Sequence, residues 1–187
     1  MQSTINVAQT FGLVGSIYDL TPYRVDAYEV ATAVNIGGIA GRKSDGTIGA
    51  MDNSVYTTFA GIFVRPHEAV NYGTVDTVTY KASPLGASLA QPAGATVQVC
   101  SMGRVIVNFT LSANSEANAK AATLADGTAI YVTPAGVLTT DADDGEASPT
   151  AYTLVGKVIK GIAAGADGVS GASTSWTKVQ PIVLQLG

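Results

Sequence analysis

Short apolar runs rich in β-branched residues recur along the whole chain, and glycine or aspartate separates them. The clearest runs are residues 97–100, 104–109, 129–132, 136–140 and 182–186. Runs of this length between turn residues are typical of β-strands. The 187 residues include a single His, a single Cys and a single Trp, so side chains suited to catalysis are scarce. We therefore expect an all-β protein, an antiparallel β-sandwich or barrel-like domain of the jelly-roll type, that binds and holds rather than catalyses.

The surface of this protein is predicted to be sparsely charged. Charged residues make up 13% of the chain and hydrophobic residues 47%, whereas an average soluble protein has about 25% charged residues. This balance favours a protein that lies against another protein. The net charge of −4 is evenly spread and includes no basic tract, which argues against direct binding of nucleic acid through its phosphates.

Several features of the sequence bear on where the protein folds. Cys100 has no second cysteine to pair with, which favours a reducing compartment. Residues 1–6 lack the basic start and the long apolar stretch of a signal peptide. No basic amphipathic helix and no apolar run of bilayer-spanning length is present. We therefore expect a soluble protein that is made in the cytoplasm and does not contact a membrane.

Two regions are predicted: an N-terminal arm over residues 1–20 and a single β-rich domain over residues 21–187. The arm contains glycines and serines that weaken any helix or strand of its own. Five large apolar residues stand among these small ones: Phe11, Leu13, Val14, Ile17 and Tyr18. We expect the arm to be ordered by the surface on which it lies and these five residues to form an interface. A first edge strand of the domain is the alternative.

Within the domain, four local features can be predicted. Residues 56–64 are predicted to form a central strand, because both of its faces are apolar or small. Residues 96–109 are predicted to form a hairpin that turns at residues 101–103, with a glycine for the positive φ. Residues 112–122 are predicted to hold one short helix. Residues 161–175, rich in Gly, Ala and Ser, are predicted to form a mobile loop.

No group of residues in the sequence matches a known catalytic or metal-binding motif well. The acidic stretch 141–146 looks like a calcium loop, but Gly145 stands where a ligand is needed and no Glu follows at the twelfth position. His67 could act as the base of a catalytic triad only beside a nucleophile, and the sequence has no Gly-x-Ser-x-Gly motif to supply one. The glycines of residues 37–42 lack the ending of a phosphate-binding loop, and Cys100 is typical of an inert small hydrophobe. We expect no catalytic residue, no metal and no cofactor.

The order of the strand-and-turn segments is more specific than any single residue. The segments are residues 11–19, 34–38, 59–65, 94–99, 102–107 and 127–138. In this order they resemble the structural cement, or capsid decoration, proteins of tailed bacteriophages. The resemblance implies a protein without catalytic residues that binds the outside of the assembled head and bridges neighbouring major capsid protein subunits. It also implies a homo-oligomer, dimer or trimer, located on the capsid exterior of the virion after synthesis in the host cytoplasm.

Two other classes of function compete with this one. A receptor- or glycan-binding module of a phage tail or fibre would present exposed aromatic residues, with Trp176 as the first candidate. An enzyme is disfavoured, because His, Cys and paired acidic residues are so sparse.

Overall fold

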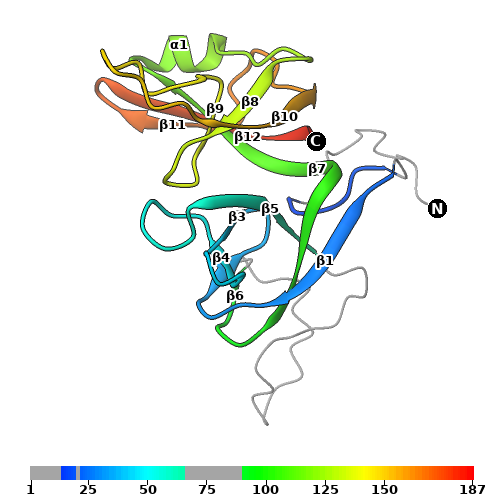
Figure 1. The fold of residues 1–187 in the computed structure, drawn as a ribbon. Helices are drawn as coiled ribbons and strands as arrows, with labels where there is room; N and C mark the ends of the chain where they lie inside the picture. The colour runs from blue at the N-terminus through cyan, green and yellow to red at the C-terminus, as the bar shows by residue number, and fades with distance from the viewer. Residues whose placement is uncertain (1–13, 20–21, 66–89) are drawn as a thin grey trace, which may run out of the picture.

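The computed structural model describes residues 14–19, 22–65 and 90–187, which form a mostly antiparallel β protein with one short helix (Figure 1). The expected all-β fold is confirmed. The elements in chain order are β1 (Arg24–Glu29), β2 (Val34–Asn35), β3 (Ile39–Arg42), β4 (Ile48–Ala50), β5 (Thr58–Val64), β6 (Ala90–Gln91), β7 (Thr96–Ala113), α1 (Glu116–Ala121), β8 (Ala129–Val132), β9 (Leu138–Thr139), β10 (Thr153–Lys160), β11 (Val169–Ala172) and β12 (Ser175–Leu186).

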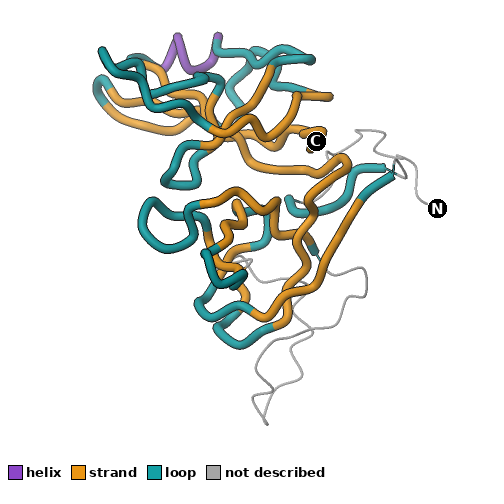
Figure 2. The backbone as a smooth tube through the Cα atoms, in the orientation of Figure 1, coloured by secondary structure: helices purple, strands orange, loops and turns teal. Residues whose placement is uncertain are grey.

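Ten of the strands form one sheet in two parts that share β7. The order along the sheet is β4-β3-β5-β7-β12-β10-β8-β9, with β1 also on β7 and β11 also on β12. We call β1, β3, β4, β5 and the beginning of β7 the first half-sheet. The remainder of β7 with β8 to β12 is the second half-sheet. Figure 2 shows strands in both groups and the helix only beside the second.

Strand β7 has 18 residues and changes partners along its length. Its beginning pairs with β1 on one side and β5 on the other, so that Val99 lies opposite both Asp26 and Phe63. From Gly103 to Ala113 it pairs with β12. Figure 1 shows β7 bending as it passes from the lower group of strands to the upper one. This strand therefore fixes the position of the two half-sheets relative to each other.

The predicted hairpin in residues 96–109 is wrong. The chain does not reverse at residues 101–103 but continues as one strand. Gly103 has a φ of 121°, which suits glycine, and a Cβ placed there would lie 2.6 Å from the Cβ of Tyr23. The glycine thus permits a bend and a close approach rather than a turn, as glycine does in bent strands.

The other local predictions have mixed outcomes. Strand β5 lies between β3 and β7, so its predicted central position is confirmed. The predicted short helix is α1, which begins after Ser115, whose Oγ accepts from the amide of Asn118 at 3.2 Å. The predicted mobile loop over residues 161–175 is wrong in its second part, where β11 pairs with β12. Gly171 there lies opposite Trp176, and its Cβ would meet the oxygen of Ser175 at 2.3 Å.

One hydrophobic cluster contains residues of both half-sheets. Ile62 and Cys100 contribute from the first half-sheet and Val105, Ile182 and Leu184 from the second. All five are fully buried. A second cluster, around Phe63, belongs to the first half-sheet. The shared cluster is the packing that a single domain over residues 21–187 would need.

Lys178 is the fully buried polar side chain of the described residues. Its Nζ donates to the carbonyl oxygens of Ala122, at 3.0 Å, and Ala163, at 2.6 Å. The ammonium thus joins the end of α1 and the segment after β10 to strand β12. No helix in the described part of the chain is long and apolar enough to cross a membrane.

Candidate interaction surface at the bend of strand β7

The described part of the N-terminal arm, residues 14–19, lies along the edge of β7 that β12 leaves open. The amide of Gly15 donates to the oxygen of Ile106 at 2.7 Å, and the amide of Ile106 donates to the oxygen of Ser16 at 3.0 Å. The amide of Tyr18 donates to the oxygen of Arg104 at 2.8 Å. The segment covers strand backbone that would otherwise be an exposed edge.

The same segment contacts Arg65, the residue after β5, and packs on the turn between β2 and β3. The amide of Arg65 donates to the oxygen of Gly15 at 2.8 Å, and its Nε donates to the oxygen of Val14 at 2.9 Å. A Cβ on Gly37 would lie 2.2 Å from Val14 Cγ1, and a Cβ on Gly15 equally close to Ile36 Cγ2. Two glycines thus allow the arm and the turn to touch. Burial lowers the pKa of the Arg65 guanidinium.

An ion pair fixes the far end of this segment. Arg104 Nη1 lies 2.7 Å from Asp19 Oδ2, and Arg104 Nε donates to Gln185 Oε1 at 2.9 Å. About a third of each charged side chain is exposed: 32% for Arg104 and 31% for Asp19. One guanidinium therefore links the arm, β7 and β12.

Three large side chains are exposed around the bend: Tyr18 (43%), Tyr23 (44%) and Met102 (43%). We call them the bend patch. Tyr18 is hydrogen-bonded through its backbone to Arg104, Tyr23 packs beside Gly103, and Met102 precedes that glycine. Figure 1 places the C-terminus of the chain beside the same bend. Tyrosine and methionine are enriched at protein interfaces, and exposed apolar groups that gather in one place mark contact sites.

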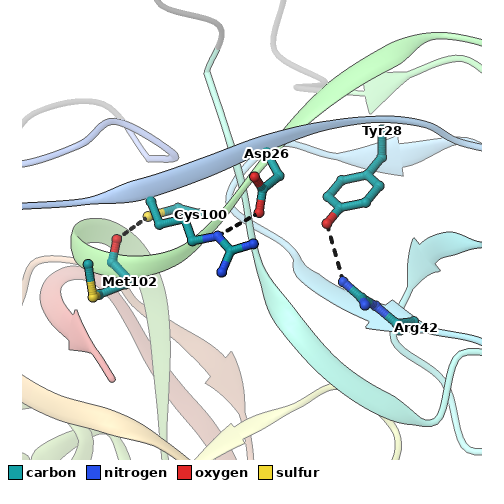
Figure 3. Close-up of polar contacts among 6 residues, drawn as sticks. Asp26, Tyr28, Arg42, Cys100 and Met102 are labelled. Atoms are coloured by element: carbon teal, nitrogen blue, oxygen red, sulfur yellow. Dashed lines mark hydrogen bonds and ion pairs between the residues drawn. The ribbon is translucent and has the colours of Figure 1, made fainter. Parts of the chain in front are cut away.

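A polar face of β1 continues from the bend patch (Figure 3). Arg24 Nε lies 3.0 Å from Asp26 Oδ2, with 69% and 39% of the side chains exposed. Two residues further along β1, the hydroxyl of Tyr28 accepts from Arg42 Nη2 at 3.2 Å, and the guanidinium carbon lies 5.9 Å from the ring centroid. Exposed pairs like these contribute little stability.

Cys100 lies beneath this surface and is not exposed on it. Its side chain is buried, and its Sγ donates to the oxygen of Met102 at 3.0 Å (Figure 3). Burial raises the pKa of the thiol, although the hydrogen bond opposes this. A buried thiol with a raised pKa is a poor nucleophile.

The acidic residues of the loop after β9 support the loop itself. Asp144 Oδ1 accepts from the amides of Thr150 at 3.1 Å and Glu146 at 3.3 Å. These backbone hydrogen bonds lower the pKa of Asp144. In residues 14–19, 22–65 and 90–187, no group of three or more His, Cys, Asp or Glu side chains is placed to hold a metal ion.

The structure brings only some of the expected interface residues to this surface. Val14 and Ile17 are half-buried against the domain, and Tyr18 is exposed in the bend patch. Phe11 and Leu13 lie outside the described residues, as does His67. The sequence analysis missed Tyr23 and Met102. Their exposure arises from the bend of β7 at Gly103, which the sequence pattern alone does not distinguish from a turn.

The fold is that of a β-rich protein, and the bend patch is its candidate contact surface. Family comparison gives a more specific answer. Residues 1–179 match the model of the structural cement protein family (E217 gp24/Pam3 gp6), and the chain belongs to this family. The resemblance noted in the sequence is thus confirmed: this is a phage structural protein associated with the capsid of the virion.

A solved structure supports the fold independently. A chain from "The capsid of Myoviridae Phage XM1" matches with a TM-score of 0.50 and 18% sequence identity. The match covers 96% of this chain and 97% of that chain. No curated protein matches the sequence. At this identity the likeness concerns the fold alone.

Proposed function

We propose that this cement protein binds the outside of the assembled phage head and stabilises it by bridging neighbouring major capsid protein subunits. Membership of the cement family supports the capsid as partner. The observation that carries the proposal is the meeting of the arm and the bend patch at one place. Residues 14–19 end at the bend with Tyr18 exposed, beside Tyr23 and Met102.

Binding across a joint would stabilise the shell through linkage. A ligand that binds only the assembled state adds its binding free energy to the stability of that state. DNA packed in the head presses outward on the joints between subunits, and many copies resist this together even when each contact is weak.

The five apolar residues of the arm have two different roles. Val14 and Ile17 hold the arm on its own domain, because they are half-buried there. Tyr18 contacts the partner together with Tyr23 and Met102, and Phe11 and Leu13 extend this contact. We also propose that the protein forms a dimer or trimer on the capsid and has no enzymatic role.

The test is sedimentation of the full-length protein with capsids that lack it. The triple variant Tyr18→Ala, Tyr23→Ala, Met102→Ala removes the bend patch. The matched control, Val137→Ala with Leu154→Ala, changes two apolar side chains that are at least as exposed, at 58% and 56%. We expect the triple variant to bind at least about tenfold more weakly, a loss of about 1.4 kcal/mol, and the control to bind normally.

Binding to isolated capsomers separates bridging from simple attachment. A protein that bridges subunits should bind the closed shell at least about tenfold more tightly than separate capsomers, because only the shell offers both halves of its site. Equal affinity for both, or an unaffected triple variant, would overturn the proposal.

A further inference from the structure

A shallow groove of about 650 Å³ lies at the end of the second half-sheet that is remote from the bend patch. It is formed where β7 ends, α1 begins and the hairpin of β11 and β12 turns. Its lining includes Asn114, Asn118, Thr174, Ser175 and Trp176. From Gly103 to Ala113, β7 spans about 33 Å at the usual rise of a strand. The groove and the bend patch are therefore separate surfaces.

The indole of Trp176 is held in place by the hairpin. Its Nε1 donates to the oxygen of Ser173 at 3.1 Å, and Ser173 has a φ of 54° in the tight turn. Across the strands Trp176 faces Gly171, where a Cβ would lie 2.7 Å from the Trp176 Cα. The close approach of Gly171 positions the backbone of Trp176, and the hydrogen bond to Ser173 restrains the indole before any ligand arrives, which lowers the entropy cost of binding.

Two amide side chains stand on the other wall. Asn118 Nδ2 donates to Asn114 Oδ1 at 2.6 Å, so each amide orients the other. Within the described part of the chain, the other two amide atoms have no hydrogen bond. Asn114 Nδ2 can therefore donate to a ligand, and Asn118 Oδ1 can accept from it. Thr174 and Ser175, next to Trp176 in the hairpin, add hydroxyl groups to the lining.

Every described residue that lines the groove is uncharged. The nearby cations are already engaged: Lys178 is buried against two carbonyl oxygens, and Lys120 pairs with Glu116 on α1. Among the residues that the structure describes, a phosphate or other anion would therefore find no free cation there. A fixed indole face with neutral hydroxyl and amide groups matches a sugar ring, which offers C–H bonds on its faces and hydroxyls around its rim.

We propose that this groove binds a neutral saccharide, an activity separate from capsid binding. The first test applies the full-length protein to a panel of immobilised neutral oligosaccharides of glucose, galactose, mannose and N-acetylglucosamine. Trp176 is the single tryptophan of the chain, so its fluorescence reports this groove directly in titrations with each sugar retained. We expect a saturable change with a Kd of about 1 mM or lower.

Variants then assign the binding to the groove. Asn114→Ala with Asn118→Ala should weaken it at least about tenfold. The control, Asn108→Ala, makes the same change at an exposed position of β7 outside the groove and should bind normally. No sugar retained, or equal binding by the double variant, would overturn the proposal. Capsid sedimentation of the double variant should stay normal, so that failure here is distinguishable from failure of the cement function.

Discussion

Asp19 Oδ2 lies 2.7 Å from Nη1 of Arg104, a residue 85 positions further along the chain. This pair fixes the end of the arm segment at the bend of β7. Because about a third of each side chain remains exposed, its value lies more in holding the arm at this position than in its contribution to the overall free energy of folding.

Removing this pair should loosen the arm more than it destabilises the fold. We expect Arg104→Ala to lower the free energy of unfolding by about 1 kcal/mol, the upper range for exposed pairs, since it also loses its contact with Gln185. Hydrogen exchange at the amides of Gly15 and Tyr18 should accelerate. Arg24→Ala, which breaks the more exposed pair with Asp26, should change neither quantity. Unchanged exchange in Arg104→Ala would contradict this role.

Gly103→Ala should destabilise the protein by at least about 2 kcal/mol. A residue other than glycine at a positive φ costs about 1–3 kcal/mol, and the added Cβ would also lie 2.6 Å from Tyr23 Cβ. Gly46→Ala is the control, since Gly46 has a φ of 89° but nothing within 4 Å of a Cβ. Urea unfolding gives the free energy of unfolding of both variants and so separates the clash from the backbone strain. Equal losses of this free energy would show that β7 accommodates the methyl group.

Lys178→Met should cost about 1–3 kcal/mol, although methionine suits a buried site. The substitution leaves the oxygens of Ala122 and Ala163 without their donor, and buried acceptors without partners carry such penalties. The rate of amide hydrogen exchange should rise in α1 and in the segment after β10. Lys157→Met, at an exposed position of β10, should leave stability nearly unchanged. A stabilised Lys178→Met protein would show that the desolvation of the ammonium outweighs its hydrogen bonds.

Local patterns predicted the elements of this fold better than their connections. Strand β5 could be predicted because apolar residues on both faces require burial on both sides. The continuity of β7 could not, because the positive φ of Gly103 suits a turn and a bend equally well. The outcome depends on β12, which pairs with β7 from Trp176 to Leu186, far along the chain.

The same limit applies to the candidate surface. Tyr18 could be predicted from its place in a segment with weak structure of its own. Tyr23 and Met102 could not, because their exposure arises only where β7 bends. The arm is joined to β7 through backbone groups of Ser16 and Ile106, which every sequence possesses and no side-chain pattern reveals.

The turn between β3 and β4 should respond to acid. The pKa of Asp45 is lowered from its ordinary 3.8 to about 2, first by the hydroxyl and amide of Thr47 and then by Lys43. A carboxyl whose folded pKa is depressed stabilises the fold above its unfolded pKa and loses this effect as the pH falls through the folded one. NMR titration should therefore show the Asp45 carboxyl protonating near pH 2, with the amide of Thr47 shifting in parallel. A midpoint near 3.8 would contradict the structure.

Two truncations test the arm. Deleting residues 1–13 should spare the fold, because the contacts of residues 14–19 with β7 remain, but it should weaken self-association or capsid binding if Phe11 and Leu13 reach a neighbour. Deleting residues 1–18 should in addition cost about 2–4 kcal/mol, since it removes the packing of Val14 and Ile17 and three backbone hydrogen bonds to β7. Thermal unfolding and capsid sedimentation of both proteins separate the two effects. If the protein without residues 1–13 unfolds, these residues belong to the core. If that protein folds and binds capsids with full affinity, residues 1–13 have no part in bridging.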